Sequence, residues 1–167
     1  MDRDLSHFRP SKLWRRMPLD RRIDAAGLFW EDEQSAEQQL EAVSAIAGHM
    51  KFRPRSVVAL APERRAKYLA QLPNVSDAIA ARALVNYHLD RQRPMMGAFL
   101  DMLGITHENG LISEEHVAKP DAEKVKQAAT DLAGKFPKEE VGLYLSTLVS
   151  QDPETWDALI EAPETEG

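Results

Sequence analysis

Two histidines and two carboxylates in the middle of the sequence are the side chains best suited to chemistry. They are His88, Asp101, His107 and Glu108. Imidazole nitrogens and carboxylate oxygens bind metal ions, and imidazole exchanges protons near neutral pH. All four residues flank a segment that is expected to fold as a helical hairpin. A site for a small ligand or a metal, and with it a helical enzyme, is therefore one hypothesis for this chain.

The spacing of the histidines argues against a metal centre. Metal sites on helices usually take paired ligands three or four residues apart, and none of the five histidines has another histidine at that spacing. The sequence contains no cysteine, which removes thiolate ligands and nucleophiles. It has no Gly-x-Ser-x-Gly motif, and its glycines are too scattered for a phosphate-binding loop. We therefore predict no catalytic residue, no metal and no cofactor.

Asp101 also has a structural interpretation, as one half of an ion pair with Arg82. Each is the only charged residue in the middle of an otherwise apolar helical segment. If these two helices run antiparallel about a turn at Gln92, the two side chains lie level with each other. Burying either charge alone would cost several kcal/mol. We therefore predict that Arg82 and Asp101 pair and fix the register of the two helices.

The elements that would position these residues are almost all helical. Prolines and serines at the starts of segments, and apolar residues at spacings of three and four, indicate about eight helices. Their expected ranges are 18 to about 30, 36–50, 54–60, 62–72, 77–91, 94–103, 121–134 and 138–150. A short last helix carries Trp156. Asn109-Gly110, with apolar residues on both sides, predicts a tight turn and a minimal β-hairpin at 105–112.

The fold class predicted from these elements is all-α. We expect an irregular antiparallel bundle of about eight helices around a central helical hairpin, 77–103, because short linkers favour antiparallel neighbours. Three regions follow from composition. Residues 1–17 form a basic N-terminal arm, residues 18–161 form a single helical domain, and residues 162–167 form a disordered acidic tail.

Charge is distributed unevenly along the chain. Residues 1–67 hold thirteen Lys and Arg against ten Asp and Glu, whereas residues 108–167 hold five against fourteen. Electrostatic fields of opposite sign on two parts of one small protein influence how it docks and which partners it binds. The basic arm also carries aromatic side chains, which suit a contact surface. The residues of the arm that we expect to bind a partner are Phe8, Arg9, Trp14, Arg15 and Arg16.

Nucleic acid is a weaker alternative partner. Arginines with interleaved aromatic residues, at 9–22 and 51–67, could hold a single strand through phosphate contacts and stacking. The net charge of −6, a pI near 5.4 and the lack of a recognisable DNA-binding motif argue against this role. The interpretation without nucleic-acid binding is that these arginines form ion pairs with acidic residues, within the chain or between chains.

The function expected from the sequence is that of a non-enzymatic helical protein-interaction module. Its basic half would hold a partner protein or a second copy of the chain, and its acidic half would carry the opposite charge. A ligand- or metal-binding enzyme and a nucleic-acid-binding protein remain the alternatives. The chain lacks cysteine, an apolar signal-peptide core and a membrane-length apolar stretch. We therefore expect a soluble cytoplasmic protein that does not bind membranes.

Overall fold

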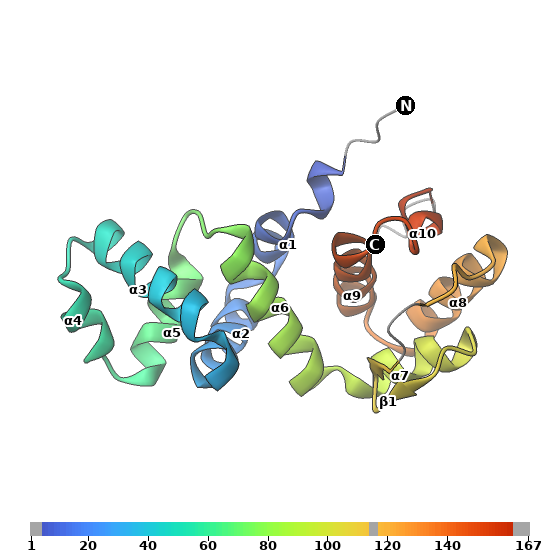
Figure 1. Ribbon diagram of the computed structural model, residues 1–167, viewed down its shortest axis with the longest axis horizontal. Coiled ribbons are helices and arrows are strands. Elements are labelled where there is room, and N and C mark those ends of the chain that lie inside the picture. The colour runs from blue at the N-terminus through green and yellow to red at the C-terminus, as the bar shows by residue number, and fades with distance from the viewer. Residues whose placement is uncertain (1–4, 114–116, 162–167) are drawn as a thin grey trace. The chain divides into compact units, whose positions relative to one another are not determined.

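The chain is all-α, as the sequence predicts. A computed structural model describes residues 5–113 and 117–161. This described part contains ten α-helices, two short 3-10 helices and one two-stranded antiparallel sheet (Figure 1). No helix in it is both long enough and apolar enough to cross a lipid bilayer. The predicted acidic tail, 162–167, lies outside the described residues.

Contacts divide the chain into two compact units, where the sequence predicted a single helical domain over 18–161. Unit 1 is Met1–Asp90 and unit 2 is Arg91–Gly167. The boundary also separates charge, because 1–90 holds fourteen Lys and Arg against twelve Asp and Glu, and 91–167 holds seven against fifteen. Each unit therefore has its own core and its own sign of net charge.

Unit 1 is built from short helices whose starts are set largely by proline. Its elements are η1 (Ser6–Phe8), α1 (Pro10–Arg16), α2 (Leu19–Glu31), η2 (Glu33–Ser35), α3 (Ala36–Met50), α4 (Pro54–Val58), α5 (Pro62–Gln71) and α6 (Asp77–Arg91), whose last residue begins unit 2. Proline occupies the first position of α1, α4 and α5, where its missing N–H leaves no hydrogen bond unmade. The helices predicted from Pro18 to Arg91 all form, within a few residues of the expected ends.

The core of unit 1 lies between α2 and α5, which make the most extensive contact of any two helices. Alanines on both facing sides are buried, and Phe29 and Leu69 fill the space beside them. Small side chains allow the two backbones to approach closely, and the larger ones supply the apolar area removed from water. α6 adds a buried stripe that includes Ile79 and Leu84.

The described part of the predicted basic arm, residues 5–17, packs against this core. Leu13 and Trp14 on α1 are each 1% exposed. The carboxylate of Asp77 at the start of α6 accepts hydrogen bonds from the backbone N–H of Ser11 (3.0 Å) and from Nη2 of Arg9 (2.8 Å). Burial tends to raise the pKa of Asp77, but these donors lower it below its usual value. α1 is therefore held to unit 1 by apolar burial and by a charged hydrogen-bond network.

Unit 2 combines four helices with the small hairpin. Its elements are α7 (Arg93–Met102), β1 (His107–Glu108), β2 (Leu111–Ile112), α8 (Ala122–Lys135), α9 (Lys138–Gln151) and α10 (Asp157–Glu161). In the hairpin His107 lies opposite Ile112, which confirms the predicted turn at Asn109-Gly110. The core is aromatic, because the ring of Phe99 lies 5.9 Å from that of Tyr144 and 5.8 Å from that of Trp156.

The two helices of the predicted central hairpin, 77–91 and 94–103, both form. The contacts, however, place α6 at the end of unit 1 and α7 at the start of unit 2. Each helix is consequently a core element of its own unit. The sequence gives equally apolar helices on both sides of Gln92, and apolar character alone does not say which neighbours each helix will choose.

Candidate functional site

His107 and Asp101 are brought together, as the ligand-site hypothesis requires. Nε2 of His107 lies 2.7 Å from Oδ1 of Asp101, and the backbone N–H of Gly110 donates to Nδ1 of His107 at 3.0 Å. Because Nδ1 accepts this bond, the neutral ring carries its proton on Nε2 and donates it to Asp101. Both ring nitrogens are therefore used in fixing the hairpin, and neither is directed at an open site.

The rest of the hairpin supports the same structural role for His107. A Cβ added to Gly97 on α7 would lie 3.2 Å from Cε1 of His107, so the imidazole ring rests directly on the helix. Nη1 of Arg93 donates to the carbonyl oxygen of Asn109 at 2.8 Å. Gly110 has φ +91°, and a Cβ there would meet the carbonyl oxygen of Arg93 at 3.0 Å. These contacts hold the hairpin against α7 at both ends.

The other two residues of the hypothesis are placed differently. Glu108 is exposed on β1. His88 lies in the core of unit 1 and is only 2% exposed, whereas the other three residues belong to unit 2. Burial lowers the pKa of His88 to about 4 from 6.5, although a hydrogen bond with the backbone of Leu84 opposes this. A buried imidazole that is neutral at physiological pH is best explained as a core residue.

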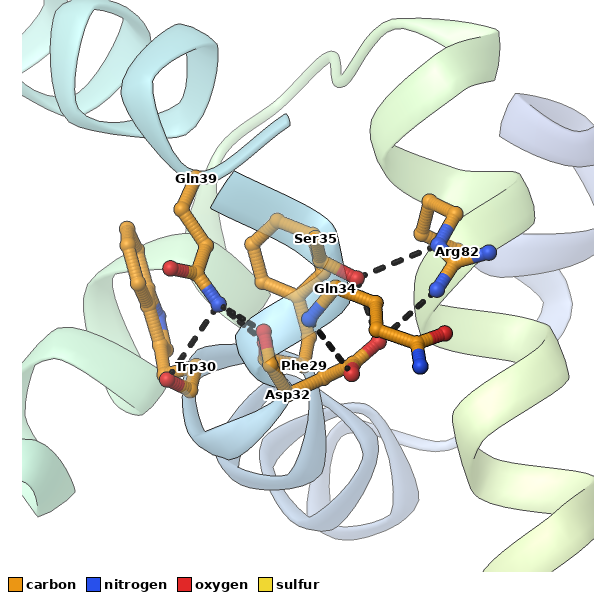
Figure 2. A network of polar contacts seen from close by, with 7 residues as sticks. All are labelled: Phe29, Trp30, Asp32, Gln34, Ser35, Gln39 and Arg82. Carbon is orange, nitrogen blue, oxygen red and sulfur yellow. Dashed lines mark hydrogen bonds and ion pairs between the residues drawn. The ribbon is translucent and has the colours of Figure 1, made fainter. Parts of the chain in front are cut away.

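Arg82 has a different partner from the one predicted. Its Nη2 lies 2.8 Å from Oδ2 of Asp32, and its Nε donates to the hydroxyl of Ser35 at 3.1 Å (Figure 2). Asp101 pairs with His107 instead. The predicted ion pair between Arg82 and Asp101 is therefore replaced by two separate pairs, one in each unit. The prediction took the partner of Arg82 from the next apolar helix, but the actual partner, Asp32, lies fifty residues earlier in the sequence.

Asp32 is the centre of a polar network at the junction of α2 and α3. Its carboxylate also accepts bonds from the hydroxyl of Ser35 (2.5 Å) and the backbone N–H of Gln34 (3.0 Å). The bond from Ser35 contributes most to lowering the pKa of Asp32 to about 2, against the opposing effect of burial, and Gln34 and Arg82 lower it further. Nε2 of Gln39 donates to the carbonyl oxygens of Phe29, Trp30 and Asp32, which closes the end of α2 (Figure 2). These hydrogen bonds connect the end of α2 to the start of α3, so we assign the network a structural role.

Most of the arm residues predicted to bind a partner are committed within unit 1. Trp14 is buried, Arg9 pairs with Asp77, and Arg16 donates to the carbonyl oxygen of His7 at 2.6 Å. Phe8 is half-buried in η1, and Arg15 is exposed on α1. Trp14 is thus corrected from a contact residue to a core residue. The aromatic and arginine pattern that suggested a binding arm instead reflects the docking of α1.

A second basic segment, at the end of α3 and along α4 and α5, remains on the surface. We name it the basic–aromatic surface. Its exposed cations are Lys51, Arg53, Arg55, Arg64 and Lys67, and its other side chains are Phe52, Val58 and Tyr68. Glu63 is the only acidic residue from 51 to 68. The helices α3, α4 and α5 that carry these residues follow one another in unit 1 (Figure 1).

Two ring contacts connect the end of α3 with α5 on this surface. The ring of Phe52, which follows α3, meets that of Tyr68 on α5 edge to face at 5.9 Å. The guanidinium of Arg64 lies over the ring of Tyr68, 6.0 Å from its centroid, and its Nη2 approaches the phenolic oxygen at 3.4 Å. Such cation–π contact is stabilising, and it fixes the direction of the arginine. Phe52 and Arg64 therefore both contact Tyr68, although they come from different parts of the segment.

The sequence identified this segment but could not separate it from the arm. Both contain arginines and aromatic residues, and both were candidates for nucleic-acid binding, through 9–22 and 51–67. Only burial distinguishes them, since Trp14 lies in the core whereas Phe52 is 36% exposed.

The described residues offer no metal-binding cluster of three or more His, Cys, Asp or Glu side chains. The exposed cations and the ring contacts make the basic–aromatic surface of unit 1 the candidate site. Comparisons of the chain with protein-family models, with curated proteins and with solved structures gave no match.

Proposed function

We propose that this protein is a non-enzymatic helical interaction module that holds an acidic partner protein on the basic–aromatic surface of unit 1. One observation carries the proposal. Within residues 5–113 and 117–161, none of the five cations of this surface makes an ion pair with another described residue. Five exposed and uncompensated positive charges, close together on a chain of net charge −6, form a local field that attracts acidic groups.

The placement of the histidines supports a binding role over a catalytic one. A general base needs a ring nitrogen within reach of a substrate. In His107 one nitrogen faces Asp101 and the other accepts from Gly110, and His88 is buried. Catalysis at either residue would first require the hairpin or the core to open. A cytoplasmic location belongs to the same proposal, since a sequence without cysteine fits a reducing compartment.

Nucleic acid is the second candidate for the same surface. The observation that favours it is the density of exposed cations on this surface, since positively charged surfaces track the phosphates of single strands in other proteins. Binding of this kind weakens steeply with salt, because each phosphate contact releases counterions. Segment 9–22 is less suited to that role, because Arg9 and Arg16 are engaged within unit 1.

The experiment compares the two basic regions of unit 1 by equal changes of charge. Arg53→Gln with Arg55→Gln removes two exposed cations from the basic–aromatic surface. Lys12→Gln with Arg15→Gln removes two exposed cations from α1. Immobilised full-length chain is used to capture proteins from the source cells, and the bound proteins are quantified by mass spectrometry. We expect the first double variant to lose a specific acidic partner that wild type and the second double variant retain.

The opposite pattern would contradict the proposal. If the Lys12 and Arg15 variant lost the partner and the Arg53 and Arg55 variant kept it, α1 would be the contact surface. Circular dichroism of both variants provides the folding control. All four substituted side chains are exposed, so their replacement should leave the thermal transition almost unchanged.

A further inference from the structure

The basic–aromatic surface pairs cations with apolar groups. On α4, Arg55 and Val58 are three residues apart, which places both on one side of the helix. Val58 is 57% exposed, although the neighbouring Val57 is completely buried. On α5, Arg64 and Tyr68 are four residues apart and in contact. The surface therefore offers apolar area beside its positive charges.

The charges on this surface suit carboxylates. Three of its five cations are arginines, and the planar guanidinium can form two parallel hydrogen bonds with one carboxylate. A partner that presents Asp and Glu side chains would satisfy these donors. The exposed methyl groups of Val58 would be left in water by such contacts alone. A partner that also covers Val58 with an apolar side chain gains additional free energy.

Both aromatic rings of the surface already have partners within unit 1, which makes them less suited to stacking on nucleic-acid bases. Stacking needs an open ring face. The edge-to-face contact, with an interplanar angle of 84°, joins Phe52 to Tyr68, and the guanidinium of Arg64 lies over the Tyr68 ring. Val58 is aliphatic and offers no π face. The observations therefore favour a protein segment over a single-stranded nucleic acid.

We infer that the basic–aromatic surface binds an acidic protein segment that carries bulky apolar side chains among its Asp and Glu residues. This inference rests on the proposed function and specifies the chemistry of the partner. The acidic side chains meet Arg53, Arg55 and Arg64, and an apolar side chain covers Val58. Affinity for such a segment depends on both salt and apolar contact, whereas affinity for a purely acidic segment depends on salt alone.

The test uses three fluorescent probes and the full-length chain. One is a peptide of glutamates with leucines at helical spacing, the second has serine in place of each leucine, and the third is a single-stranded RNA of similar net charge. Fluorescence anisotropy gives the dissociation constant of each. The leucine peptide should bind most tightly. Val58→Ser should weaken its binding by about tenfold and leave the serine peptide unchanged. Arg55→Gln should weaken both peptides.

The matched control is Leu40→Ser, which removes an exposed apolar side chain on α3 outside the basic–aromatic surface. Leu40 is 69% exposed, so its replacement should change neither the fold nor peptide affinity. A chain with Val58→Ser that retains the wild-type thermal transition shows that a loss of binding is not a loss of folding.

Equal affinity for the two peptides would overturn the inference and leave the proposed function intact, because an acidic partner without apolar side chains would then suffice. No affinity for either peptide would also overturn the inference. Tighter binding of the RNA would overturn both the inference and the proposed function in favour of nucleic acid. A salt-sensitive oligomer of wild type that is dissolved by Arg53→Gln with Arg55→Gln would identify a second copy as the occupant. The proposed function fails separately, if the capture experiment shows no dependence on residues 53 and 55.

Discussion

The Nη2 atom of Arg82 lies 2.8 Å from Oδ2 of Asp32, and this ion pair ties α6 to the end of α2 across fifty residues of sequence. The side chain of Asp32 is 20% exposed and that of Arg82 is 34% exposed. The pair is therefore partly shielded from water, where charge-assisted hydrogen bonds are strong and a lost partner is costly. It is the clearest polar link between distant parts of unit 1.

Asp32→Asn should destabilise unit 1 by about 2 kcal/mol at neutral pH. The pKa of Asp32 is lowered from 3.8 to about 2, so its contribution is fully present above pH 3.8. It is lost as the pH falls toward 2, because protonation then becomes favourable in the folded state too. Urea unfolding at pH 7 and at lower pH should show the gap between variant and wild type closing. Glu33→Gln, at an exposed neighbouring residue, is the control, and an equal effect there would refute a specific role for Asp32.

His88 should make the protein less stable in mild acid. Burial lowers its pKa from 6.5 to about 4, so the unfolded chain takes up a proton below pH 6.5 that the folded chain refuses. Stability from this residue is complete above pH 6.5 and decreases as the pH falls toward 4. Between pH 7 and pH 5 the loss should be about 2 kcal/mol.

The measurement is the difference in unfolding free energy between pH 7 and pH 5 for wild type and for His88→Gln. The variant should show a smaller difference, whatever its absolute stability. His49→Gln, at an exposed histidine of α3, should keep the wild-type difference. An unchanged pH dependence in His88→Gln would mean that the imidazole is not held neutral by burial.

Gly97→Ala should loosen the hairpin from α7. The added methyl group would lie 3.2 Å from Cε1 of His107, which is too close unless the imidazole moves. Movement would strain the bonds to Asp101 and Gly110, and we expect a loss of about 1–3 kcal/mol. The amide resonance of Gly110 should shift in a nitrogen–proton spectrum, because its N–H bonds to that ring.

Gly142→Ala provides the matched control for Gly97→Ala. Gly142 lies within α9 of the same unit, and nothing lies within 4 Å of a Cβ placed there. This substitution should stabilise the chain by about 0.5–1 kcal/mol, because alanine loses less conformational freedom in a helix. Similar effects at both glycines would show that the close contact with His107 is not important.

Lys51→Gly should stabilise the end of α3. Lys51 has φ 58°, and the backbone N–H of Phe52 bonds to the carbonyl oxygen of Ala47 at 2.9 Å, which is the usual end of a helix closed by glycine. Removing the Cβ relieves a conformation that costs about 1–2 kcal/mol. Thermal unfolding should show a gain for Lys51→Gly and none for Lys51→Ala, which keeps its Cβ. Equal behaviour of the two variants would argue against strain at this residue.

The sequence by itself determined the helices and the turn. Proline at the starts of α4 and α5, and apolar residues at spacings of three and four, act within one or two turns of chain, so they can be seen without knowing the tertiary structure. Asn109-Gly110 specified its turn in the same local way, and Asn109 and Gly110 both have positive φ.

Only the tertiary structure decided which residues meet. Arg82 pairs with Asp32 because α6 lies beside the end of α2, and Asp101 pairs with His107 because the hairpin packs against α7. Trp14 and Phe52 occupy similar basic and aromatic stretches of sequence, yet one is in the core and the other is on the surface. Burial depends on contacts between distant segments, and local sequence carries little information about those contacts. For this reason only the tertiary structure distinguishes the exposed basic segment from the buried one.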